Sequence, residues 1–268
     1  MKNFMRKKMK VVILAGGFGT RISEESAFKP KPMIEIGEMP ILWHIMKEYS
    51  AHGFNEFVIC AGYKQHVIKE WFSDYFIQHS DVTFDYTNGE NEITIHNKNI
   101  EPWKVTIVDT GLNTQTGGRV KKIQEYVGNE TFMLTYGDAI GDVNITELLE
   151  YHKKQGKIGT VSVYNFGQNK GVLEIGENGI VDAFREKSDL DGDLINIGFM
   201  VFEPELFKYI PGDSTVFEQE PMNNLVLEHQ LAAYTHHGFW QCMDTMREKE
   251  KLEKLWESGN APWKVWNN

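Results

Sequence analysis

The residues best suited to bind an anion directly follow the apolar run 11–15. Residues 16–21 read Gly-Gly-Phe-Gly-Thr-Arg. Glycines let backbone N–H groups approach an anion closely, because they carry no Cβ. Thr20 adds a hydroxyl donor, and Arg21 adds a planar cation that matches phosphate oxygens. The segment predicts a phosphate-binding turn, with a purely structural turn as the alternative.

Three other phosphate-binding motifs do not match this turn. A P-loop requires Gly-Lys-Ser or Gly-Lys-Thr, and the chain contains neither tripeptide. A dinucleotide fingerprint that starts at Gly17 requires glycine at position 22, where Ile22 stands. A protein kinase requires a His-Arg-Asp catalytic loop, which the sequence lacks. If the turn binds phosphate, it belongs to a different class of protein.

Two lysines alternate with prolines about ten residues after the glycine turn, as Lys29-Pro30-Lys31-Pro32. Each proline fixes its own φ and biases the preceding residue toward extended backbone, so we expect a stiff strut that presents both ammonium groups. The net charge of −10 argues against binding to nucleic acid or to an anionic membrane. Phosphate binding therefore requires a local basic pocket. We interpret the lysine pair as a polyphosphate clamp, with a surface charge cluster as the alternative.

Two carboxylates follow apolar runs, the first of which is predicted to be a strand. Asp138 comes after the run 132–136, and Asp244 comes after the run 239–243. A carboxylate at the carboxyl end of a strand in an α/β fold suits a metal ion or a cation, whereas a helix cap or turn is the alternative for Asp138. Nothing in the spacing shows that the two carboxylates meet. The sequence has no zinc motif and no Gly-x-Ser-x-Gly nucleophile turn, so no covalent nucleophile is predicted.

The elements that position these residues alternate between apolar runs and helical patterns. Such alternation predicts a Rossmann-like α/β fold, with a mostly parallel sheet flanked by helices, right-handed crossovers and ligands at the carboxyl ends of the strands. The second half adds short strands separated by turns, hence β-rich elaborations. Strands are predicted over 11–15, 57–61, 83–96 (with a central turn), 105–108, 132–136, 161–164, 171–175, 180–185 and 197–202. Helices are predicted over 41–52, 65–77, 119–126, 145–155 and 248–257, with a polar loop over 110–118.

The domain organisation follows from the absence of a linker or repeat. We expect an N-terminal extension over 1–8, with Met1 or Met9 as the start, and one domain over 9–268 with halves at about 9–140 and 141–268. The apolar run after the basic N-terminus is too short for an export signal or a membrane span. Cys60 and Cys242 both lie among apolar residues, and we expect thiols and a cytoplasmic protein.

These motifs resemble the sugar-nucleotide pyrophosphorylases, whose hallmark is an N-terminal strand, then Gly-Gly-x-Gly-Thr-Arg, then Lys-Pro. The resemblance runs nearly end to end, and segments such as 101–103, 116–119 and 261–264 are most similar to the cytidylyl-transferring branch. It implies transfer of a nucleotidyl group from CTP to α-D-glucose 1-phosphate with Mg²⁺, which gives CDP-glucose and pyrophosphate. It also implies a homo-oligomer that supplies a dideoxysugar or lipopolysaccharide pathway. UTP or dTTP as the donor, or a non-catalytic nucleotide-sensing protein on the same fold, are the alternatives.

The same resemblance implies the site residues. Arg21, Lys31 and Asp138 would be catalytic, and Asp138 with Asp244 would hold Mg²⁺. The nucleotide would be bound by Leu14, Ala15, Gly16, Gly17, Phe18, Gly19, Thr20, Arg21, Lys31, Thr114, Arg119 and Gly137. Glu186 and Lys187 match the sugar-phosphate motif Glu-Lys-Pro, although Ser188 replaces the proline. The chain also departs from the family at 169–171, where Asn-Lys-Gly replaces Arg-Phe-Gly, and at position 242, where a proline is usual.

Overall fold

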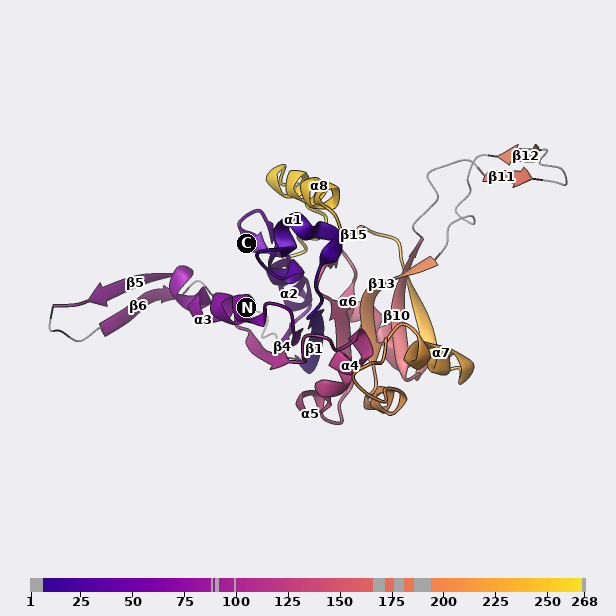
Figure 1. Ribbon diagram of the computed structural model, residues 1–268, viewed down its shortest axis with the longest axis horizontal. Coiled ribbons are helices and arrows are strands. Elements are labelled where there is room, and N and C mark those ends of the chain that lie inside the picture. The colour runs from indigo at the N-terminus through magenta and orange to yellow at the C-terminus, as the bar shows by residue number, and fades with distance from the viewer. Residues whose placement is uncertain are drawn as a thin grey trace.

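The computed structural model describes residues 7–87, 89, 92–98, 100–165, 172–175, 181–185 and 194–266. A seven-stranded sheet runs through the molecule in the order β14-β10-β13-β8-β1-β4-β7 (Figure 1). These strands span Leu231–His236 (β14), Gly159–Asn165 (β10), Leu194–Phe202 (β13), Phe132–Tyr136 (β8), Lys7–Ala15 (β1), Phe54–Ala61 (β4) and Lys104–Asp109 (β7).

The sheet is mostly parallel, as the sequence predicts. Strand β1 pairs in parallel with β4 and β8, β4 pairs in parallel with β7, and β10 pairs in parallel with β14. Only β13 is antiparallel among the seven strands, because it runs against both β8 and β10. The carboxyl ends of β1, β4, β7 and β8 therefore meet at one edge of the sheet. The predicted fold class is confirmed.

Helices cover both faces of the sheet, and successive side chains of β1 explain why. Val11 and Ile13 belong to the core on one face, whereas Val12 belongs to the core on the other. Period-2 alternation sends neighbouring apolar side chains to opposite faces, so the strand must be buried on both sides. The helices that pack against the first face are α2 (Ile41–Ala51), α3 (Gln65–Gln78), α6 (Ile145–Gln155) and α8 (Met246–Glu257). Those that pack against the second face are α4 (Thr116–Lys122), α5 (Gln124–Val127), α7 (Glu220–Leu227) and the 3₁₀ segment η4 (Pro204–Tyr209).

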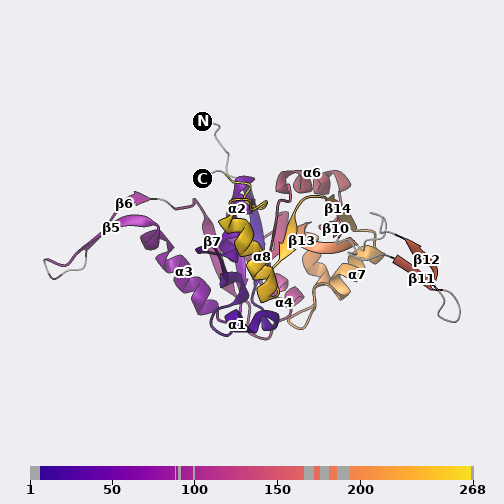
Figure 2. The same cartoon turned by 90° about the horizontal axis from the view of Figure 1, so that it is seen from above.

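Short elements complete the molecule. Two antiparallel ribbons project from opposite ends of the sheet, β5–β6 and β11–β12 (Figures 1 and 2). The β11–β12 ribbon is one of the elaborations predicted for the second half, whereas the predicted strands 161–164 and 197–202 join the main sheet as β10 and β13. The β5–β6 ribbon matches the strand, turn and strand predicted over 83–96. The remaining elements are η1 (Thr20–Ile22), α1 (Ser23–Ser26), η2 (Lys31–Met33), β2 (Glu35–Ile36), β3 (Met39–Pro40), β5 (Ser80–Asp85), β6 (Glu92–Lys98), β9 (Ala139–Gly141), β11 (Val172–Ile175), β12 (Val181–Arg185) and β15 (Trp240–Cys242).

The lysine–proline segment differs from the extended strut that the sequence predicts. Pro30 is extended, but Lys31–Met33 forms a 3₁₀ turn. The turn is closed by hydrogen bonds from the Met33 N–H to the Pro30 carbonyl at 2.8 Å and from the Ile34 N–H to the Lys31 carbonyl at 3.0 Å. These bonds outweigh the local bias of the residue before a proline, and the prediction of an extended strut is wrong.

Two further boundaries shift. The predicted loop 110–118 ends early because α4 begins at Thr116, and the predicted helix 119–126 divides into α4 and α5 at Ile123. Strand β14 and helix α7 have no counterpart in the predicted elements. In the described parts of the chain, the helices lack the combined length and apolarity needed to cross a bilayer.

Candidate functional site

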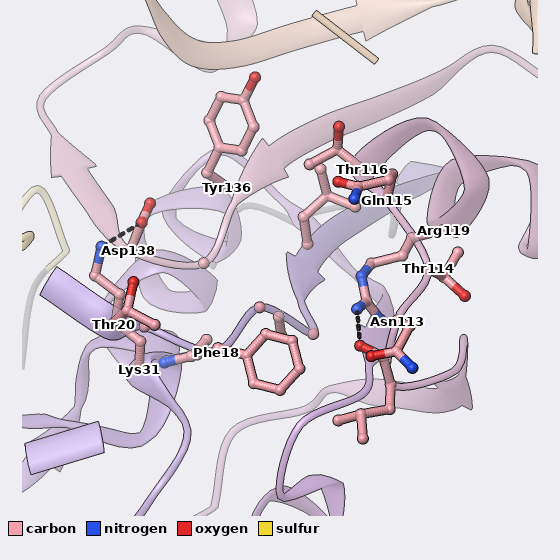
Figure 3. Close-up of a pocket in the computed structure, with 18 of the residues that line it drawn as sticks. Phe18, Thr20, Lys31, Asn113, Thr114, Gln115, Thr116, Arg119, Tyr136 and Asp138 are labelled. Atoms are coloured by element: carbon pink, nitrogen blue, oxygen red, sulfur yellow. Dashed lines mark hydrogen bonds and ion pairs between the residues drawn. The ribbon is translucent and has the colours of Figure 1, made fainter. Parts of the chain in front are cut away.

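A cavity of about 550 Å³ opens at the carboxyl edge of the sheet (Figure 3). Its volume falls in the range of small-molecule sites. All twelve residues predicted to bind nucleotide lie around it, together with Asp138. The lining consists of Leu14, Ala15, Gly16, Gly17, Phe18, Gly19, Thr20, Arg21, Lys31, Pro32, Leu112, Asn113, Thr114, Gln115, Thr116, Arg119, Tyr136, Gly137 and Asp138.

The three glycines of the turn after β1 have different surroundings. A Cβ on Gly16 would lie 2.1 Å from a guanidinium nitrogen of Arg119, whereas a Cβ on Gly17 would meet nothing within 4 Å. Gly19 has a φ of 65°, in the left-handed region that glycine adopts without strain. The turn is also fixed from outside, because the Tyr63 N–H donates to the Gly16 carbonyl at 3.2 Å. Gly17 thus leaves open space on the side of the cavity.

The side chain of Arg119 is 5% exposed and is held by hydrogen bonds to neighbouring loop atoms. Its guanidinium donates to the Thr110 hydroxyl at 2.7 Å, the Gly111 carbonyl at 2.7 Å and the Leu112 carbonyl at 3.2 Å. Burial lowers the pKa of Arg119 from its usual value, but a guanidinium keeps its proton in proteins. Arg119 therefore fixes the loop 110–115 against the glycine turn, in addition to lining the cavity.

Lys31 stands between the two predicted metal-binding carboxylates. Its ammonium donates to Asp138 Oδ2 at 2.6 Å and to Asp244 Oδ1 at 2.5 Å, and the other oxygen of Asp244 accepts from Arg21 at 2.6 Å. Burial by itself would lower the pKa of Lys31, but the charges and hydrogen bonds of the two carboxylates prevail and raise it. The structure thus brings all four charged residues together, which the spacing in the sequence does not show.

A short ribbon explains how residues 138 and 244 meet. Strand β9 pairs antiparallel with β15, with Ala139 opposite Cys242. The Met243 N–H donates to the Asp138 carbonyl at 2.8 Å. Asp138 directly precedes β9, and Asp244 follows Met243, the residue directly after the end of β15. At the start of α8, Glu248 accepts hydrogen bonds from the N–H groups of Asp244 and Thr245 at 2.7 and 2.8 Å. The ribbon and the helix cap together set the position of Asp244.

The donor set of this pair fits a hard divalent cation. Asp138 and Asp244 present carboxylate oxygens to the same cation, the Lys31 ammonium. Mg²⁺ is commonly bound by one or two carboxylates together with phosphate oxygens from the substrate. Within the described ranges, no group of three or more His, Cys, Asp or Glu side chains is placed to hold a metal by itself. The pair therefore suits a metal that arrives with a polyphosphate.

Several residues that line the cavity are not predicted from the sequence as site residues. Leu112, Asn113 and Gln115 lie in the loop 110–118, which the sequence marks only as polar and glycine-containing. Tyr136 ends β8, and Thr116 begins α4. A signal was available for Tyr136, since it is the last residue of a predicted strand whose carboxyl end faces the ligand edge.

Other predicted residues lie elsewhere. Lys29 does not line the cavity; its ammonium pairs with Glu35 at 2.9 Å, so the expectation of a two-lysine clamp is wrong for Lys29. Glu186 and Lys187 fall outside the described residues. Both cysteines are free thiols, Cys60 fully buried and Cys242 partly buried.

The fold and the cavity define an α/β protein with a glycine-lined, nucleotide-sized pocket at the carboxyl edge of a mostly parallel sheet. Comparison with known proteins narrows this class. Residues 10–245 match the family model described as nucleotidyl transferase. The glucose-1-phosphate cytidylyltransferases of Salmonella typhi and Salmonella typhimurium are each 51% identical to the chain over 259 residues, which cover 96% of this chain and 100% of theirs. The chain belongs to the nucleotidyl transferase family.

A solved structure supports the fold at much lower sequence identity. The UDP-glucose pyrophosphorylase complexed with UDP-glucose is similar with a TM-score of 0.68 at 17% identity. The similarity covers 94% of this chain and 99% of that one. Since the sequences have diverged so far, this likeness concerns the fold alone.

Proposed function

We propose that the protein transfers a cytidylyl group from CTP to α-D-glucose 1-phosphate, with CDP-glucose and pyrophosphate as products. The observation that carries the proposal is the convergence of the open glycine turn, Lys31, Arg21 and the two aspartates at one edge of the sheet. The end-to-end similarity to the Salmonella cytidylyltransferases supports CTP and glucose 1-phosphate as the substrates. We further propose that residues 9–268 act as one domain in the cytoplasm.

The proposed reaction requires no protein base. The second pKa of a phosphate monoester is about 6, so most of the sugar phosphate is a dianion at neutral pH. Its oxygen attacks the α-phosphorus of the triphosphate in line, a new P–O bond forms, and the bond to the departing pyrophosphate breaks with its electron pair. Catalysis then depends on alignment and on neutralisation of charge. The absence of a nucleophile–base motif from the sequence is in keeping with this mechanism.

The cationic side chains of the cavity have distinct tasks in this proposal. Lys31 is 7% exposed, so its ammonium acts in a poorly hydrated environment where its interaction with phosphate oxygens is strong. We assign Lys31 to the charge that develops at the α-phosphate. Arg21 has a side chain that is 73% exposed at the mouth of the cavity, where it can follow the departing pyrophosphate. Gly17, where a Cβ would meet no atom within 4 Å, leaves room for the triphosphate beside the backbone.

Asp138 and Asp244 would hold Mg²⁺ in this proposal. When bound, the ion would supply positive charge that offsets the negative charge of the substrate phosphates. Asp244 keeps its position through the cap of α8, and Asp138 through the β9–β15 ribbon.

We also propose a homo-oligomer. The β5–β6 ribbon projects from the body (Figure 1), and its side chains Phe84 and Ile93 are exposed, as is Tyr86 directly after β5. A two-stranded ribbon is at best marginally stable alone in water, so cover by a second copy would stabilise it. Light scattering on the purified protein tests this point; a monomer at micromolar concentration would contradict it.

One assay tests the proposed reaction. The pure protein is incubated with glucose 1-phosphate, Mg²⁺ and either CTP, UTP or dTTP, and pyrophosphate is measured. We expect release with CTP and its loss when a chelator removes the metal. Release with UTP or dTTP instead would correct the nucleotide. No release with any triphosphate, despite measurable nucleotide binding, would favour a nucleotide sensor and refute the catalytic proposal.

A further inference from the structure

A carboxylate outside the cavity lining joins two hydroxyl groups of the cavity wall. Glu218 lies in the segment between η4 and α7. The Tyr136 hydroxyl donates to its Oε1 at 2.7 Å, and the Thr116 hydroxyl donates to its Oε2 at 2.7 Å. Both hydroxyl-bearing residues line the cavity, on the side away from Phe18 (Figure 3). The proposed catalytic roles use none of these three residues.

The fold gives Tyr136 a specific place. On the neighbouring strand β13, Gly198 adopts a φ of 86°, and a Cβ there would lie 2.4 Å from the ring of Tyr136. The pairing of Met200 with Leu134 brings Gly198 beside Tyr136 in the sheet. A glycine thus provides the room into which the phenol turns.

The direction of these hydrogen bonds determines what the wall offers to a ligand. A phenol or an alcohol has one hydroxyl proton to donate. Tyr136 and Thr116 each donate theirs to the carboxylate of Glu218. Thr116 in addition accepts from the Phe217 N–H at 2.9 Å. The lone pairs that remain on the two hydroxyl oxygens are acceptors. A phosphate at neutral pH presents acceptors only, so this wall suits a ligand group that donates a hydrogen bond.

The donor groups nearest to a reacting phosphate are sugar hydroxyls. Tyr136 lies between Asp138 and Thr116 in the cavity (Figure 3), and all three residues line it. We propose that Tyr136, Thr116 and Glu218 form a binding subsite for a hydroxyl group of the sugar ring attached to the reacting phosphate. Both substrates of the proposed reaction carry such a ring, ribose in CTP and glucose in the sugar phosphate. The proposal rests on the proposed function.

The test replaces Tyr136→Phe, which removes the acceptor oxygen and keeps the ring. Tyr209→Phe is the matched control, because the Tyr209 hydroxyl donates to Glu228 at 2.6 Å but does not line the cavity. We expect Tyr136→Phe to lower kcat/KM about 3- to 10-fold, the range for one hydrogen bond, and Tyr209→Phe to leave it unchanged. Glu218→Gln is the second variant, with a loss of similar size, should Tyr136→Phe fold poorly.

Deoxy substrates identify the ring. The comparison is repeated with 2′-deoxy-CTP and 3′-deoxy-CTP, and with glucose 1-phosphates that lack one ring hydroxyl each. The wild-type advantage over Tyr136→Phe disappears with the analogue that lacks the recognised hydroxyl, which assigns the subsite to ribose or to glucose. An advantage that persists with every analogue, or that is absent with the parent substrates, overturns the subsite. Wild-type turnover of the parent substrates tests the proposed function separately.

Discussion

Replacement of Gly16 by alanine tests the contact between the glycine turn and Arg119. The new Cβ would lie 2.1 Å from one guanidinium nitrogen and 2.4 Å from the central carbon of Arg119. Such distances do not occur between non-bonded atoms, so the guanidinium must move. The buried Arg119 has little free space, because its nitrogen atoms are bound to the hydroxyl of Thr110 and to the carbonyl groups of Gly111 and Leu112.

The size of the effect follows from the bonds that would break. The two shortest bonds of Arg119, to Thr110 and Gly111, are 2.7 Å long. A hydrogen bond from a charged donor contributes about 1.5–3 kcal/mol, so their loss would lower the free energy of unfolding by about 3–6 kcal/mol. A domain of this size loses about 2 °C in Tm per kcal/mol, which predicts a fall of about 6–12 °C. Release of the loop 110–115 should also weaken CTP binding at least about tenfold.

Gly17→Ala is the matched control. Its Cβ meets nothing within 4 Å and projects into open space beside the cavity. We therefore expect Gly17→Ala to keep the wild-type Tm and to weaken CTP binding, whereas Gly16→Ala lowers both. Differential scanning calorimetry gives the Tm, and isothermal titration calorimetry gives the affinity for CTP.

Two outcomes would refute the reasoning. The first is a Gly16→Ala protein that melts within about 2 °C of wild type and binds CTP normally. The second comes from a double-mutant cycle with Arg119→Ala. Because the overlap disappears with the guanidinium, Gly16→Ala should cost little in that background. An undiminished cost there would show that the contact with Arg119 is not the cause.

The remaining predictions concern the reacting centre, the buried Glu48 and the two cysteines. Asp138→Ala should lower kcat about a hundredfold, or about 3 kcal/mol of transition-state stabilisation, at saturating Mg²⁺; near-normal turnover would rule out its catalytic role. Burial raises the pKa of Glu48 well above its usual value, and its Oε2 has no hydrogen-bond partner among the described residues, although Oε1 accepts from the Gly141 N–H. A raised pKa means that wild type is most stable below the ordinary pKa of a glutamate and loses stability as the pH rises toward the shifted value. Glu48→Gln should remove this loss. The unfolding free energy of the variant, relative to wild type, should therefore rise by about 1.4 kcal/mol per pH unit in that window. Denaturant titrations that show a constant difference between the two proteins from pH 5 to pH 8 would contradict this prediction. Burial also raises the pKa of Cys60 to about 12 and that of Cys242 to about 11. Alkylation of the native protein at pH 8 should therefore be slow at both thiols and become fast only in denaturant, as mass spectrometry of the alkylated protein can show.

Local sequence patterns predict much of the fold because they act over a few residues. The continuous apolar run before Gly16 identifies the central strand β1, and Pro40 and Gly53 flank the helix α2 that precedes β4. The β-branched runs predict parallel strands, and their carboxyl ends predict the ligand edge. The lysine–proline segment shows the limit of such reasoning. Its 3₁₀ turn depends on backbone hydrogen bonds that outweigh the bias of single residues.

The sequence by itself determined which chemical groups are present, because the residue type alone fixes the functional group. This holds for the glycines without a Cβ and for Lys31, Arg21 and Asp138. Only the tertiary structure decided where those groups meet. Asp244 lies 106 positions after Asp138 (244 − 138), and the two come together because β9 pairs with β15. Arg119 became a support for the glycine turn because its side chain packs against Gly16. Strand pairing and side-chain packing over such separations depend on the whole folded chain, and no local pattern encodes them.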